Sequence, residues 1–118
     1  HKIMVMGDVN EIDALVDFIK KDKSTDVIAY RSKAEYLEIA HRSISKKTAI
    51  NTLLSEQFPE LQMKNVLAFG DNFNDIDMLK SVGKGVAVEN AIEEVLAIAD
   101  TVTSKNIEDG VANYLETN

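Results

Sequence analysis

The chain has 118 residues, of which 20 are acidic and 13 are basic, and its formal net charge is −7. It contains no cysteine, which excludes disulfides, zinc–thiolate centres and thiol nucleophiles. The acidic balance argues against binding to nucleic acid, and apolar runs of only a few residues argue against a membrane span. We therefore expect a cytoplasmic protein that contacts neither nucleic acid nor membrane.

The first part of the chain predicts the order strand, helix, strand, strand. The apolar run 3–6 predicts the first strand. Apolar residues at helical spacing then predict a helix that Asn10 caps and that ends in the polar residues 20–24. The runs 27–30 and 36–39 are rich in β-forming residues and predict the two other strands.

A longer helix is expected to begin at Lys46, with Ser45 as its cap and Pro59 as its stop. Its apolar residues form one stripe, made of Ala49, Ile50, Leu53, Leu54 and Phe58. The run 66–69 that follows is apolar at every position. This pattern is typical of a strand that is buried on both faces of a parallel sheet.

Helices and strands then alternate to the end of the chain. A helix over about 75–81 is expected to be closed by Gly83, and Asn90 is expected to cap the next helix. The remaining elements are two strands and a final helix, at 85–88, 101–103 and about 107–115. This alternation predicts an α/β fold, in which parallel strands are flanked by helices.

The pattern of elements changes near residues 40–45, and this change predicts a domain boundary. We place the two parts at residues 1–42 and 43–118. The chain begins with His1 rather than methionine, so we expect a processed chain or a piece of a longer one.

The stretch from Phe69 to Asp75 is the strongest candidate for a functional site, because it links a buried strand to a helix. In open α/β sheets, ligands bind at that edge. Gly70 allows the backbone to turn, and Asp71 and Asp75 place two carboxylates in one tight turn, with Asp77 nearby. Such a cluster suits Mg²⁺, and the N-terminus of the following helix favours an anion.

A purely structural interpretation of this stretch is also open. Asn74 could cap the helix, while Asp75 and Asp77 complement its dipole. This interpretation leaves unexplained why Asp71 directly follows a buried strand and a glycine.

Lys46 and Lys47 stand at the start of a helix, where a positive charge is unfavourable to the helix dipole. A phosphate group held at the same edge of the sheet would explain a lysine there. The alternative is that both lysines are simply solvated.

Several blocks of the sequence, in order, resemble the C-terminal half of haloacid dehalogenase-like (HAD) phosphatases, and most of all the Cof-type subfamily. The blocks are Lys46, GDNFNDIDML at 70–79, GVAVENA at 85–91, Ala99-Asp100 and EDGV at 108–111. The resemblance implies that residues 43–118 form part of a Rossmann-like HAD core. It also implies that residues 1–42 are the last β-α-β-β piece of an α+β cap domain.

The resemblance further implies a Mg²⁺-dependent phosphatase that hydrolyses small phosphate esters, such as sugar phosphates, through an aspartyl-phosphate intermediate. In that family's pattern, Lys46 would neutralise the phosphoryl oxygens and Asp71 would bind the metal. Asn74 would hydrogen-bond the substrate phosphate. Asp75 would either bind the metal through water or orient Lys46, and Asn90 would belong to a supporting loop.

The D-x-D block that carries the family's nucleophile does not occur on a strand of this sequence; Asp75-Ile76-Asp77 has only its letters. We therefore expect an inactive fragment whose strand 66–69 exposes an apolar edge and promotes self-association. Two alternatives stay open. The chain could be a non-catalytic or regulatory module that binds Mg²⁺ and phosphate, or a structural α/β domain in which Asp71 and Lys46 are ordinary surface residues.

Overall fold

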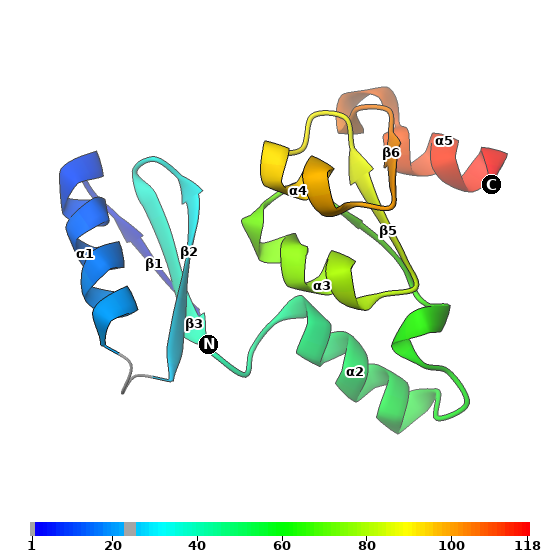
Figure 1. The fold of residues 1–118 in the computed structure, drawn as a ribbon, viewed down its shortest axis with the longest axis horizontal. Coiled ribbons are helices and arrows are strands. Elements are labelled where there is room, and N and C mark those ends of the chain that lie inside the picture. The colour runs from blue at the N-terminus through cyan, green and yellow to red at the C-terminus, as the bar shows by residue number, and fades with distance from the viewer. Residues whose placement is uncertain (1, 23–25) are drawn as a thin grey trace. The chain divides into compact units, whose positions relative to one another are not determined.

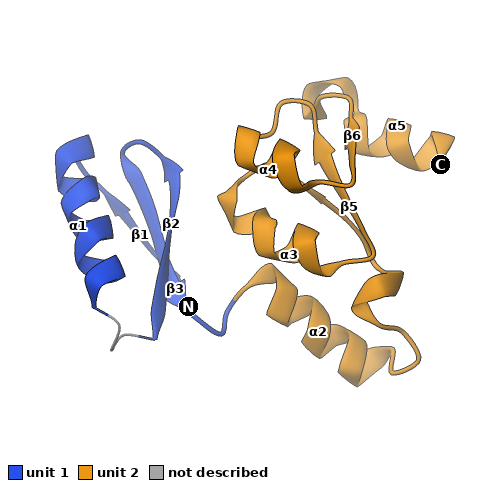
Figure 2. Ribbon diagram, viewed as in Figure 1, with its two compact units in different colours: residues 1–44 blue, residues 45–118 orange. Residues whose placement is uncertain are grey.

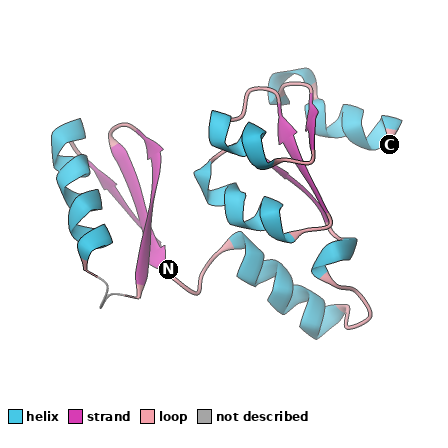
Figure 3. Cartoon of the chain, viewed as in Figure 1, coloured by secondary structure: helices cyan, strands magenta, loops and turns pink. Residues whose placement is uncertain are grey.

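The computed structural model describes residues 2–22 and 26–118, which divide into two compact units with the boundary between Ile44 and Ser45 (Figure 2). Each unit has its own sheet, as Figure 3 shows. His1 and the predicted helix end at Lys23 and Ser24 lie outside the described residues. The assignment of the first unit to a cap domain stays a prediction.

The first unit is an antiparallel sheet with one helix packed on it (Figure 1). Its elements are β1 (Lys2–Met6), α1 (Val9–Lys21), β2 (Val27–Lys33) and β3 (Tyr36–His41). The strands lie in the order β1-β3-β2, and Ile12 of α1 and Leu37 of β3 are buried between helix and sheet. The predicted order of elements is confirmed. The predicted cap Asn10 is wrong, because α1 begins earlier, with Asp8 as its N-cap.

The second unit is the predicted parallel sheet flanked by helices. Its elements are α2 (Lys46–Gln57), β4 (Leu67–Gly70), α3 (Ile76–Ser81), β5 (Lys84–Val88), α4 (Glu93–Ile98), β6 (Thr101–Thr103) and α5 (Gly110–Thr117). The strands lie in the order β4-β5-β6 and pair in parallel. Short 3₁₀ turns at Met63–Asn65, Phe73–Asp75 and Asn106–Glu108 precede β4, α3 and α5.

The core of this unit lies along β5 and the faces of α3 and α4 that cover it, with Ala68, Met78, Leu79, Ala87 and Val95 at its centre. The central strand β5 is buried from Gly85 to Val88. Within the described chain, β4 pairs only with β5, and Leu67 is 39% exposed. The prediction that the 66–69 strand is buried on both faces is therefore wrong at Leu67, although the next residue, Ala68, is buried.

Helix α2 buries only part of the stripe that its sequence predicts. Leu54 is buried, whereas Leu53 and Phe58 are 52% and 44% exposed. Its predicted cap is confirmed, since the Ser45 hydroxyl accepts a hydrogen bond from the Thr48 backbone N–H at 3.1 Å. The described part of the chain therefore covers only some of the apolar side chains of α2.

The helix predicted over 75–81 ends at Ser81 as expected, but the capping roles predicted for Gly83 and Asn90 are wrong. Gly83 is not in a left-handed conformation; its N–H donates to the Met63 carbonyl at 2.9 Å, and a Cβ there would lie 1.8 Å from the Lys64 carbonyl oxygen. Close backbone approach, rather than a left-handed turn, requires this glycine. The N-cap of α4 is Ile92, so Asn90 does not cap that helix.

Candidate functional site

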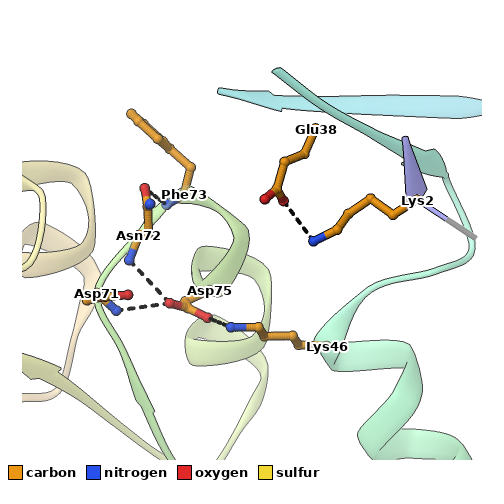
Figure 4. Close-up of polar contacts among 7 residues, drawn as sticks. All are labelled: Lys2, Glu38, Lys46, Asp71, Asn72, Phe73 and Asp75. Atoms are coloured by element: carbon orange, nitrogen blue, oxygen red, sulfur yellow. Dashed lines mark hydrogen bonds and ion pairs between the residues drawn. The ribbon is translucent and has the colours of Figure 1, made fainter. Parts of the chain in front are cut away.

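The turn between β4 and α3 is built around the carboxylate of Asp75 (Figure 4). Asp75 is buried and only 2% exposed. Its Oδ2 accepts hydrogen bonds from the backbone N–H groups of Asp71, at 2.9 Å, and Asn72, at 3.2 Å. Its Oδ1 pairs with the ammonium of Lys46, which reaches over from the first turn of α2. Both oxygens of this buried anion therefore have partners, as buried charge requires.

The protonation of Asp75 follows from these contacts. Burial alone raises the pKa of the carboxyl, but hydrogen bonds from Lys46 and from the Asp71 and Asn72 backbone outweigh it, and the pKa lies below its ordinary value. Asp75 is consequently ionised at neutral pH. The Lys46 side chain remains 50% exposed, so its ammonium can face solvent or a ligand while it contacts Asp75.

The ion pair bears on the alternative interpretations of the sequence. Lys46 is not simply solvated, because it is bound to a buried carboxylate from another element. Lys47 lies 3.9 Å from the exposed Asp77, and such a surface pair contributes little. The amide that caps the turn is Asn72, whose side chain accepts from the Phe73 N–H at 2.8 Å, so a capping role for Asn74 is wrong.

Gly70 lets β4 and this turn approach each other closely. A Cβ at this position would lie 2.6 Å from the Cβ of Asp75 and 3.0 Å from a methyl of Leu79. Its φ is not positive, so close packing rather than a left-handed turn is what demands glycine. The buried carboxylate can therefore lie directly beneath the end of the strand.

A cavity of about 240 Å³ opens beside the ion pair. Lys46, Asp71 and Asp75 all line it, so the fold brings three of the predicted site residues together. Asn74 lies in the same turn but does not line the cavity. Apolar walls come from Phe69, Val88 and Val111, and the cavity thus combines charged groups with an apolar lining.

Sequence reasoning missed one polar residue of this cavity, Asn106, in the turn that follows β6. Besides the helix cap that the structure contradicts, the sequence assigned Asn90 to a supporting loop. Asn90 and Asn106 are linked, because the Asn90 side-chain oxygen accepts a hydrogen bond from the backbone N–H of Asn106 at 3.0 Å. The only signal for Asn106 was its place after a strand at the same sheet edge.

Comparison with known proteins places this site in a family. The family model described as haloacid dehalogenase-like hydrolase matches residues 1–115. A Haemophilus influenzae protein named "Putative phosphatase" is 43% identical over 98% of this chain and 43% of its own length. The chain belongs to the haloacid dehalogenase-like hydrolase family. The family that the motifs predict is thereby confirmed.

Two further relatives of this HAD-like chain extend the comparison. The 5-amino-6-(5-phospho-D-ribitylamino)uracil phosphatase YcsE of Bacillus subtilis is 36% identical over 86% of this chain and 39% of its own length. The solved structure of a haloacid dehalogenase-like hydrolase from B. subtilis is 30% identical, with a TM-score of 0.85, over 98% of this chain and 40% of that one. The HAD-like chain therefore spans less than half the length of the relatives that it matches.

Phosphatases of the HAD superfamily generally use Mg²⁺. The carboxylates that line the cavity can therefore be compared with the ligands that this ion requires. Asp71 is exposed, lines the cavity and has no described hydrogen bond or ion pair on its carboxylate, so it fits as a direct ligand. Asp75 has both oxygens engaged and could act only through water or through Lys46. The described residues hold no group of three acidic or histidine side chains placed for a metal, so they fit one part of a magnesium site.

Proposed function

We propose that this chain carries the lysine and metal-binding part of the active site of a Mg²⁺-dependent phosphatase. The proposal rests on the Lys46–Asp75 ion pair at the C-terminal ends of the parallel strands. The carboxylate of Asp71, which has no described hydrogen bond or ion pair, lines the same cavity. A fixed ammonium next to a metal-binding carboxylate is what transfer of a phosphoryl group needs, because negative charge must be stabilised there.

Each residue has a definite role in this proposal. Asp75 holds the Lys46 side chain in place, and Lys46 binds the phosphoryl oxygens and stabilises their charge in the transition state. Asp71 holds the magnesium ion, which when bound supplies positive charge opposite the phosphate. Asn74, predicted to bind the phosphate, would have to turn toward the cavity to do so.

The reaction that we propose is hydrolysis of a small phosphate ester through an aspartyl phosphate. Neither aspartate of the 75–77 block is placed as a strand-borne nucleophile, since Asp75 lies in a 3₁₀ turn and Asp77 in α3. The proposal therefore assigns the nucleophile to a segment other than these 118 residues, and this chain alone is expected to be inactive.

The proposed substrate is a small phosphorylated metabolite, such as a sugar phosphate. The name of the B. subtilis relative, a phosphatase of a phosphoribityl compound, supports this class. The cavity supports it as well, because apolar walls beside a charged floor suit a phosphate attached to an organic group.

Two measurements on the chain test the proposal. Isothermal titration calorimetry with inorganic phosphate and Mg²⁺ should show binding that Lys46→Ala weakens about ten-fold or more, since a hydrogen bond to a charged group is lost. Lys47→Ala is the matched control and should bind as the wild type does, because Lys47 does not line the cavity.

Turnover of p-nitrophenyl phosphate with Mg²⁺ should be absent for the chain alone. Activity that co-purifies with the chain and disappears in Asp71→Ala would overturn its proposed inactivity. Equal phosphate affinity in the wild type and in Lys46→Ala would overturn the proposed role of the ion pair.

A further inference from the structure

The cavity lies where all three parallel strands of the second unit end, and each strand's exit contributes to it. Gly70 closes β4, Val88 closes β5 and Asn106 follows β6, and all three line the cavity. Ligands of parallel α/β sheets bind outside the carboxyl ends of the strands. Asn106 is the polar side chain that the exit of the third strand presents there.

The loop that carries Asn106 is fixed at several points. Its backbone N–H donates to the Asn90 side-chain oxygen at 3.0 Å. The residues on either side of the loop are also joined, because the Thr103 hydroxyl donates a hydrogen bond to the Gly110 carbonyl at 2.8 Å. Asp109 has a left-handed φ of 55°, the only positive φ among the described non-glycine residues. A loop held in this way offers a side chain in a set position rather than a mobile one.

The Asn106 side chain itself takes no part in holding the loop. It is exposed, and its amide has no hydrogen bond to any described group, although the backbone of the same residue is bound. An asparagine amide carries two N–H donors and no charge. Beside Asp71 and Asp75, such a group can bind an anion without adding to the negative charge of the cavity.

We infer that Asn106 binds the phosphoryl group of the substrate together with Lys46, and that Asn90 is a positioning residue for it. The inference rests on the proposed function, because it takes the cavity to hold a phosphate. The Asn106 amide donates to a phosphoryl oxygen, and Asn90 acts only through the backbone N–H that it holds. The turn after β6 thereby becomes part of the binding site.

Calorimetry of the whole chain with inorganic phosphate and Mg²⁺ tests the role of Asn106. Asn106→Ala should weaken binding about ten-fold, because one hydrogen bond to a charged group is lost, and Asn106→Asp should weaken it further by placing a third carboxylate at the cavity. Asn51→Ala is the matched control, since Asn51 is an exposed amide on α2 that does not line the cavity.

The role of Asn90 is tested by rescue. Asn90→Ala should weaken phosphate binding several-fold and shift the NMR signal of the Asn106 amide, with no change in the urea midpoint, because Asn90 is exposed. Asn90→Asp keeps the accepting oxygen and should bind phosphate as the wild type does. A loss of affinity that tracks a lower urea midpoint would overturn positioning in favour of a merely structural role.

The outcomes separate this inference from the proposed function. If Lys46→Ala weakens phosphate binding while Asn106→Ala and Asn106→Asp bind like Asn51→Ala, the inference about Asn106 fails and the proposed function stands. If the wild type binds no phosphate with Mg²⁺, both are overturned.

Discussion

Replacement of Asp75 by asparagine should destabilise the second unit, although the two side chains have nearly the same shape. The carboxylate is buried and is bound by Lys46 and by the backbone N–H groups of Asp71 and Asn72. In Asp75→Asn the amide oxygen can still accept from the two N–H groups. Its NH₂, however, faces the Lys46 ammonium, so two donors meet.

The size of the loss follows from these contacts. A hydrogen bond to a charged group exceeds a neutral one by about 1 kcal/mol, and two backbone bonds are weakened in this way. The lost contact with Lys46 adds only about 0.5 kcal/mol, because that side chain is 50% exposed and its charge is screened by water. Because the asparagine variant no longer buries a charge at this position, the desolvation cost falls, and this offsets part of both losses. We therefore expect a decrease in the free energy of unfolding of about 1–2 kcal/mol.

Urea denaturation, followed through NMR signals of Lys84–Val88, measures the stability of the second unit by itself. Asp77→Asn is the matched control, since its side chain is 59% exposed and lies 3.9 Å from Lys47, and it should change stability by less than about 0.5 kcal/mol. If the two variants lose the same small free energy, the assignment of Asp75 as the stabilising centre of the turn is wrong.

Two further predictions follow from the charge of Asp75 and from the edge of the sheet. Because the folded state lowers the pKa of Asp75, its ionised form stabilises the fold above the ordinary aspartate pKa of about 4, and this contribution is lost as the pH falls through the folded pKa. The urea midpoint of the second unit should therefore fall below about pH 4, and the fall should be shallower in Asp75→Asn; equal slopes would contradict this. We also propose that the edge of β4 with which no described strand pairs causes self-association. Sedimentation velocity should then detect dimers or larger species that Leu67→Lys reduces, whereas a wild-type monomer at all concentrations would refute it.

The sequence predicted the elements of this chain better than their ends. Apolar runs and helical spacing record which segments are buried, and the order of strands and helices was confirmed in both units. Helix caps depend on the path of the loop before them, which periodicity does not record. Asn10 and Asn90 are good capping residue types, yet the chain turns into its helices at Asp8 and Ile92 instead.

Burial on both faces of the 66–69 strand could not be predicted from its apolar residues alone, because an apolar run does not say how far other elements cover each face of the sheet. Leu67 is 39% exposed, and among the described strands only β5 pairs with β4. Leu53 and Phe58 on α2 are likewise apolar residues that are exposed although their spacing predicts burial.

The site was predictable where a local sequence motif carries it, and not where tertiary structure assembles it. Asp71 and Asp75 lie in one turn, and their spacing alone placed two carboxylates at the end of a strand. Lys46 comes from 29 positions away, and the resemblance to the family, rather than spacing, linked it to Asp75. Asn106 belongs to no recognised motif and lies far in sequence from Lys46 and Asp71, yet it lines the same cavity, and the Asn90 side chain accepts a hydrogen bond from its backbone N–H. A single asparagine after a three-residue strand carries no pattern that distinguishes it from an ordinary turn residue, so its role emerges only from the arrangement of the three strand exits.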